Sequence, residues 1–139
     1  MTVETKNFHI HTKGETDILD ITPYVSKEIQ DSKIRSGIGT VFVSGSTAGI
    51  TSIEYESGVV QDLKDAIDRM APRNISYRHD ARWGDGNGFA HVRAALLGAS
   101  FTVPFKDKRM LLGTWQQIVL LDFDNRPRSR EILVQVIGE

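Results

Sequence analysis

The chain contains no cysteine, which excludes disulfide bonds, a thiolate nucleophile and cysteine-ligated zinc. It also lacks an excess of either charge, because 17 lysines and arginines nearly balance 18 aspartates and glutamates. These charges are mixed along the sequence, so we expect no nucleic-acid partner. No apolar run approaches membrane-spanning length, and the first residues lack the apolar segment of a secretion signal. We therefore predict a cytoplasmic protein that does not contact a membrane.

What the chain does have is 139 residues, of which 40% are hydrophobic, enough for one domain with a sizeable core. No repeat or linker divides it, so residues 1–139 are predicted to form a single domain. Apolar periodicity predicts three helices, at residues 22–36, 57–70 and 89–97, and seven or eight strands with short turns between them. This pattern indicates an α+β fold, a compact domain with a mostly antiparallel, sandwich-like sheet.

Two of the predicted strands carry specific expectations. In the first strand, which ends at Thr12, Val3 occupies an odd position whereas Phe8 and Ile10 occupy even ones. A bulge near residues 6–7 would bring these apolar side chains to one face. Residues 113–122 are predicted to form another strand, with a polar and aromatic entry followed by an apolar body.

The segment around which the rest of the chain is arranged is residues 77–91. It contains His79, Asp80, Asn87 and His91 among arginines, aromatics and three glycines. No helix or strand periodicity runs through residues 78–88, so we predict an irregular loop. Loops that gather imidazole, carboxylate and guanidinium groups are frequent sites of chemistry, although a solvated surface loop is the alternative.

Three interpretations of the two histidines remain open. In the favoured one, His79 and His91 bind a divalent metal together with a carboxylate from Asp80, Asp85 or Glu54. Imidazole ligands favour Zn²⁺, and Mg²⁺ is the second choice. In another, one histidine is a general acid or base that Asp80 orients, while Arg82 or Arg130 neutralises a substrate phosphate. In the third, the histidines only hold the loop together.

Two other segments could contribute to binding. Residues 44–51 place the hydroxyls of Ser46, Thr47 and Thr51 around two glycines, an arrangement that can enclose a phosphate or carboxylate. A plain turn between strands is equally consistent with this composition. Trp115 and Gln116 could stack under a planar ring and read its edge, or Trp115 could simply be buried in the sheet.

Taken in order, these residues resemble the YjbQ family of small single-domain proteins. The resemblance rests on Ser-Thr-Ala-Gly-Ile-Thr-Ser-Ile-Glu at residues 46–54, Tyr-Arg-His-Asp at 77–80, Ala-His at 90–91, Gly-Thr-Trp-Gln at 113–116 and Ser-Arg at 129–130. It implies catalytic roles for Glu54, His79, Asp80 and His91. The substrate-binding residues expected from the resemblance and from the segments above are Ser46, Thr47, Thr51, Asn87, Trp115, Gln116 and Arg130. Ile53 stands where many relatives have asparagine, so this chain lacks one amide in the expected pocket.

The resemblance also implies a homotrimer and an activity. Family members are often described as secondary thiamine-phosphate synthases, which join a pyrimidine diphosphate to a thiazole phosphate with loss of pyrophosphate. We therefore expect an enzyme that acts on a small phosphorylated molecule. The alternative is a trimeric protein that binds a metal or ligand without catalysis.

Overall fold

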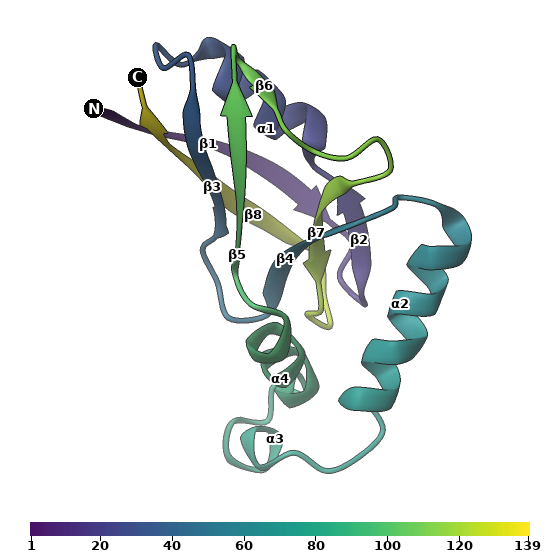
Figure 1. The fold of residues 1–139 in the computed structure, drawn as a ribbon. Helices are drawn as coiled ribbons and strands as arrows, with labels where there is room; N and C mark the ends of the chain where they lie inside the picture. The colour runs from purple at the N-terminus through teal and green to yellow at the C-terminus, as the bar shows by residue number, and fades with distance from the viewer.

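A computed structural model describes all residues from Met1 to Glu139 and shows two antiparallel sheets with helices around them (Figure 1). The larger sheet has the strand order β1 (Thr2–Thr12), β8 (Arg128–Gly138), β3 (Gly37–Val43), β5 (Ser100–Lys106) and β6 (Arg109–Met110). The smaller sheet has the order β2 (Asp17–Asp20), β7 (Gln117–Asp122) and β4 (Ala48–Ile53). The helices are α1 (Thr22–Asp31), α2 (Ser57–Met70), α3 (Arg78–Trp83) and α4 (Gly88–Leu97). The predicted α+β, sandwich-like fold is confirmed.

Strand β7 lies between two hydrophobic cores and contributes side chains to both. Its side chains alternate: Ile118 and Leu120 pack between the two sheets and against α1, whereas Val119 and Leu121 pack on the opposite side against α4 and α2. Alternation of this kind follows from the period of two residues in a strand. A strand covered on both faces has to be apolar at every position, as β7 is from Ile118 to Leu121.

The first strand is regular, and the predicted bulge is wrong. The pairing of β1 with β8 runs without interruption from Thr2 opposite Gly138 to Thr12 opposite Arg128. Even-numbered side chains such as Phe8 and Ile10 face the core, and Val3 lies exposed on the outer face. One apolar side chain on the solvent face costs little, so the strand keeps its register.

The prediction that residues 78–88 form an irregular loop is wrong in part, because a fourth helix, α3, begins at Arg78. Tyr77, which precedes it, is extended, and Gly84 ends the helix in the left-handed conformation. The sequence of α3 shows no apolar periodicity, because the helix spans only six residues and buries none of them. The predicted strand 113–122 also begins later, at Gln117, since residues 113–116 form a turn.

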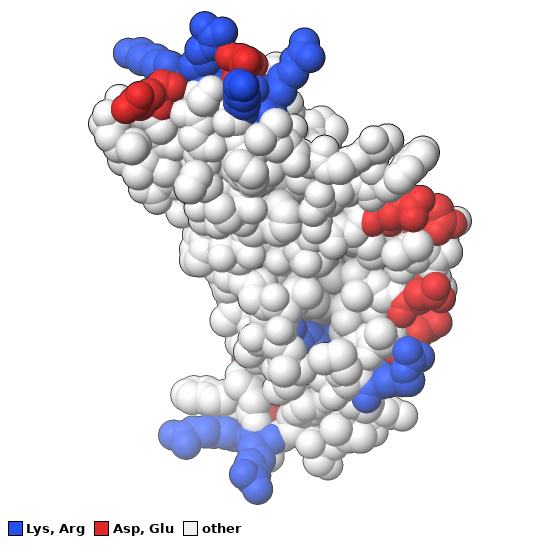
Figure 2. Space-filling view, viewed as in Figure 1, with Lys and Arg blue, Asp and Glu red and all other residues white.

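The outer surface is uneven in charge. Charged side chains gather at the two ends of the view in Figure 2 and along the edge formed by α2, and the middle of this face carries almost none. Uncharged residues of β3, including the exposed Ile38 and Phe42, lie on the outer face of the larger sheet. None of the four helices combines the length and the hydropathy that crossing a membrane requires.

Candidate functional site

His79 and His91 lie in contact, although twelve residues separate them in sequence. Each belongs to the first part of a helix, His79 in α3 and His91 in α4, and the ring centroids are 4.5 Å apart with the planes tilted by 43°. Both residues are half-buried. The sequence therefore located a true cluster, and two short helices, rather than a folded-back loop, bring the rings together.

Asp80 ties these two helices to one another. Its Oδ1 accepts a hydrogen bond of 2.8 Å from the backbone N–H of Gly88 and lies 3.6 Å from Nδ1 of His79. Only glycine fits at residue 88, because a Cβ there would lie 2.6 Å from Cβ of Tyr77 and 3.0 Å from Oδ1 of Asp80. The close approach of α3 to α4, and with it the histidine contact, depends on that missing side chain.

One ring nitrogen of His79 is enclosed beside a carboxylate. Nδ1 of His79 is enclosed and has no hydrogen-bond partner. The carboxylate of Asp80 is the nearest charged group, so a proton on Nδ1 would face a negative charge. That tautomer leaves Nε2 of His79 as an acceptor, the form that a general base needs.

A cavity of about 360 Å³ opens beside His91. Apart from the histidine, its walls are made of glycine, serine and alanine from the turn before β4 and from one face of α4. The lining residues are Gly45, Ser46, Ala48, His91, Ala94, Ala95, Gly98 and Ala99. Walls of such small side chains leave room for a ligand next to the imidazole.

Arg130 lies behind this cavity in a buried ionic cluster. Its guanidinium donates to both carboxylate oxygens of Asp122, at 2.7 and 2.8 Å, and to Oγ1 of Thr47 at 2.6 Å. Oγ1 of Thr12 donates to the same carboxylate at 2.6 Å. These contacts use Nε and Nη2 and fix the plane of the side chain, which is only 7% exposed.

The remaining nitrogen of Arg130 faces Gly45. Nη1 has no hydrogen-bond partner within the chain, and a Cβ on Gly45 would lie 2.8 Å from it. Gly45 also has a φ of +151°, in the region that favours glycine. Because Gly45 lines the cavity beside His91, its missing side chain leaves a guanidinium donor next to that cavity.

Asp124 extends the cluster toward α4. It accepts hydrogen bonds from Thr47 at 3.0 Å, from Arg128 at 2.8 Å and from the amide of Asn87 at 3.3 Å. Burial raises the pKa of Asp124, but the hydrogen bonds from Arg128, the Asn125 backbone N–H, Asn87 and Thr47 outweigh it and lower that pKa to about 2. Two carboxylates therefore balance two guanidinium groups, and the cluster carries no net charge.

The candidates Thr47 and Asn87 are part of this cluster and do not lie free in the cavity. The hydroxyl of Thr47 both accepts from Arg130 and donates to Asp124. Asn87 is 7% exposed, and its Oδ1 is enclosed without a partner. Ser46 is the exposed hydroxyl of the turn, and Thr51 lies half-exposed in the middle of β4.

A second group of candidates lies at the other end of β4. Trp115 is 72% exposed in the turn before β7, so its burial in the sheet, one of the two alternatives, is wrong. Gln116 donates to Oγ of Ser52 at 3.2 Å and accepts from the backbone N–H of Gly113 at 3.1 Å. An open groove here is lined by Asp20, Glu54, Tyr55, Glu56, Thr114, Trp115 and Gln117.

The length of β4 separates the two groups within one chain. Ala48 begins the strand at the histidine cavity, and Glu54 follows its last residue. At about 3.3 Å per residue, the six positions between Ala48 and Glu54 span roughly 20 Å. Glu54, Trp115 and Gln116 are thus remote from His79 and His91, and no three His, Asp or Glu side chains converge as metal ligands.

Asp122 and Asp124 are the residues that sequence reasoning missed. They anchor the whole cluster. The available signal was the position of Asp122, a carboxylate that directly follows four apolar residues of one strand. A charge at such a position is buried and needs a partner.

Known proteins with the same fold and related sequences exist. A family model described as UPF0047 protein YjbQ-like matches residues 6–139. A UPF0047 protein of Methanothermobacter thermautotrophicus is 40% identical over all of this chain and 95% of its own length, and one of Methanocaldococcus jannaschii is 38% identical over 95% of this chain and 93% of its own. A crystal structure of a protein of unknown function from Sulfolobus solfataricus has a TM-score of 0.89 and 31% identity, covering 99% of this chain and 100% of that one.

Proposed function

Since this chain belongs to the UPF0047 YjbQ-like family, we propose that it is an enzyme acting on a phosphorylated small molecule in the cavity beside His91. The observation that carries the proposal is the unpartnered Nη1 of Arg130, which faces Gly45 in the wall of that cavity. An anionic oxygen bound there would bring its ester or anhydride bond to a group that transfers protons.

Each residue has a part in this proposal. Nη1 of Arg130 and the hydroxyl of Ser46 bind the phosphate, and Asp122 keeps the guanidinium in place. His91 donates or accepts the proton, while His79 packs on its ring and Asp80 holds the two helices together. A general acid or base positioned in this way contributes about 10²- to 10⁴-fold to a rate.

The specific reaction that we propose is thiamine-phosphate synthesis as a secondary activity. The alanine and glycine walls suit the flat ring of such a substrate, and hydrogen bonds to the departing pyrophosphate stabilise its charge. A cytoplasmic location is part of the same proposal, because a chain without cysteine needs no oxidising compartment.

We further propose that the functional unit is a homotrimer in which Glu54, Trp115 and Gln116 of one copy meet the histidines of another. Two observations support this. The Glu54 groove is open and lies roughly 20 Å along β4 from Ala48, which lines the histidine cavity. Exposed apolar side chains, among them Trp115, Ile38 and Phe42, are of the kind that contacts between copies bury.

A metal does not fit the residues of one chain. His79 and His91 supply two imidazoles, but Nδ1 of His79 is enclosed against Asp80, and no three His, Asp or Glu side chains are arranged to hold an ion. We propose that Zn²⁺, in preference to Mg²⁺, binds the two histidines only where a second copy supplies a further ligand. Elemental analysis of the purified protein, compared with His79→Ala and His91→Ala, tests this point.

The test of the enzyme proposal is turnover with a panel of phosphate esters and with the pyrimidine diphosphate and thiazole phosphate pair. We expect His91→Ala to lower kcat by about 100-fold or more. Gly45→Ala should weaken substrate binding by about tenfold, because the new methyl group covers Nη1 of Arg130. His11→Ala, a change of the same kind on the exposed face of β1, is the control and should leave turnover unchanged.

Mixing two inactive variants tests the trimer. His91→Ala and Glu54→Ala trimers that exchange subunits should regain about a quarter of wild-type turnover, since one interface in four then has both intact halves. No recovery would mean that each site lies in one chain. If phosphate esters bind without turnover by any preparation, the protein is a non-catalytic binding protein and the enzyme proposal is wrong.

A further inference from the structure

Helix α4 separates two cavities of different character. One face of the helix lines the histidine cavity, and the opposite side, with Arg93, Leu96 and Leu97, lines a second cavity against α2. This second cavity has a volume of about 130 Å³. Its walls are Leu63, Ala66, Ile67, Met70, Ala71, Arg93, Leu96 and Leu97.

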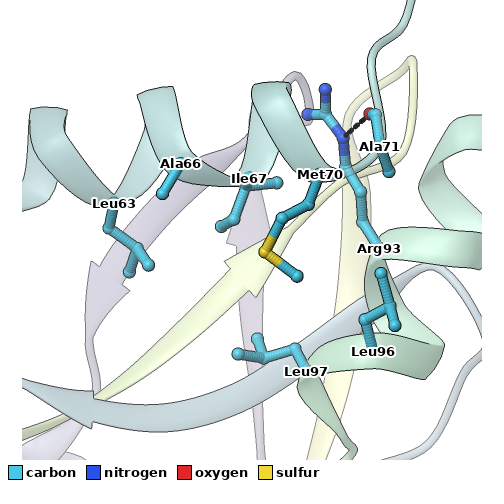
Figure 3. A pocket seen from close by; sticks show the side chains of 8 residues that line it. All are labelled: Leu63, Ala66, Ile67, Met70, Ala71, Arg93, Leu96 and Leu97. Carbon is cyan, nitrogen blue, oxygen red and sulfur yellow. Dashed lines mark hydrogen bonds between the residues drawn. The ribbon is translucent and has the colours of Figure 1, made fainter.

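The walls of this cavity offer almost no polar partner. Figure 3 shows the Met70 side chain extending from α2 toward Leu97, with the guanidinium of Arg93 turned away from the space between them. The guanidinium donates to the Ala71 carbonyl at 3.0 Å, to Thr16 at 2.9 Å and to Asp68 at 3.0 Å. Only the aliphatic stem of Arg93 is left for the cavity. Water held there would lack the two to four polar partners that it requires.

The mouth of the cavity is apolar as well. Met70 is 64% exposed and Leu96 is 58% exposed, and they come from the two different helices that form the walls. Large apolar side chains at the rim of an apolar cavity favour an uncharged ligand. A methionine in the wall adapts to the shape of whatever enters.

We propose that the space between α2 and α4 binds a small uncharged apolar molecule, of the size of a benzene ring or a short alkyl group. An apolar cavity of about 150 Å³ is known to stay dry and to accept benzene. A partner helix would need a row of anchor sites spaced along a groove, and this cavity has room for one group only. The proposal does not depend on the enzyme function proposed above.

Binding here would act mainly on α2. Ile67 is the one buried residue of that helix, and it lines the cavity. Helix α4, in contrast, is fixed on β4, because Leu97 fills the place of a side chain at Gly49, 2.6 Å from where a Cβ would lie. A ligand between the two helices would therefore hold α2 more tightly against α4.

Toluene is the probe, and thermal unfolding of the full chain is the measurement. At ten times its Kd, toluene should raise the Tm of the wild type by about 3–6 °C. Ala66→Leu fills the cavity and should abolish this rise, whereas Ala95→Leu, on the other face of α4, should retain it. Benzoate, which has the same ring with a charge, should give no rise.

Methyl NMR spectra of the wild type provide a measurement that needs no variant. Toluene should shift the resonances of Leu63, Met70 and Leu97 and leave those of Ala95 and Ala99 unchanged. The absence of these shifts, or an equal Tm rise in a folded Ala66→Leu variant, would overturn the proposal. The proposal would also be overturned if toluene caused these shifts only after dilution to the monomer. In that case a side chain of a second copy occupies the cavity in the oligomer.

Discussion

Strand β4 has a different kind of surface at each end. At Ala48 it meets a buried cluster in which Arg130 and Asp122 hold each other in one fixed geometry. At Ile53 it leads to an open groove where Glu54 has no ion-pair partner and Trp115 is mostly exposed. The first end is preorganised within a single chain, and the second is not. One chain thus orders the charged side chains at one end of β4 and leaves Glu54 at the other end without an ion-pair partner.

The largest expected effect comes from breaking the organised end. Asp122→Ala removes both carboxylate oxygens that accept from the Arg130 guanidinium and leaves its buried charge unpaired, so the free energy of unfolding should fall by about 3–5 kcal/mol. Urea titration measures it. Asp62→Ala, on the exposed side of α2, is the control and should cost less than about 0.5 kcal/mol. An equal loss in both variants would show that the cluster adds nothing.

Acid should weaken the same end in a defined range. The pKa of Asp124 is about 2 in the folded protein and 3.8 ordinarily, so its ionised form stabilises the fold above pH 4. This contribution, about 2 kcal/mol, is lost as the pH falls from about 4 through 2. Unfolding of the wild type and of Asp124→Asn should be compared over this range. The variant should have the smaller pH dependence, and equal slopes would contradict the assignment.

The contact between α3 and α4 should respond to a single methyl group. Gly88→Ala places a Cβ 2.6 Å from Tyr77, and the helices must separate at a cost of about 1–3 kcal/mol. NMR should then show loss of the close contact between the rings of His79 and His91. Gly113→Ala is the matched control, because the nearest atom to its new Cβ lies 3.7 Å away and no change in stability is expected.

The smallest effect on the single chain is expected at the open end. Trp115→Ala should change the unfolding free energy of a dilute monomer by less than about 0.5 kcal/mol, since the ring has little to pack against. Sedimentation velocity should nevertheless show weaker self-association, if this end is completed by a second copy. A Trp115→Ala variant with normal association and lower stability would reverse the comparison.

Much of this architecture could be predicted from local pattern. The helix at Ser57–Met70 has the predicted bounds, because its apolar stripe repeats over four turns. The fold class followed from alternating strands with short turns. Helix α3 could not be predicted in this way, since it buries no side chain and has no apolar stripe.

The site was predicted in part. The cluster of His79, Asp80 and His91 could be anticipated because chemistry-bearing residues crowd one polar segment. The partners of Arg130 could not, since Asp122 and Arg130 lie on strands of different sheets, which meet only in the folded chain. The separation of Glu54 from the histidine end of β4 follows from the length of an extended strand, which the sequence gives only once the bounds of β4 are known.

Strand β7 has a consequence for how the molecule opens. The two faces of β7 belong to two different cores. If the elements that cover one face detach, the other face stays covered, so β7 remains in place. The backbone amides of Ile118–Leu121 should therefore exchange hydrogen with solvent only when the whole chain unfolds. Helix α2, with one buried residue, should exchange through local opening long before that. We therefore expect hydrogen exchange to be slowest in β7 and fastest in α2, the helix that lines the apolar cavity.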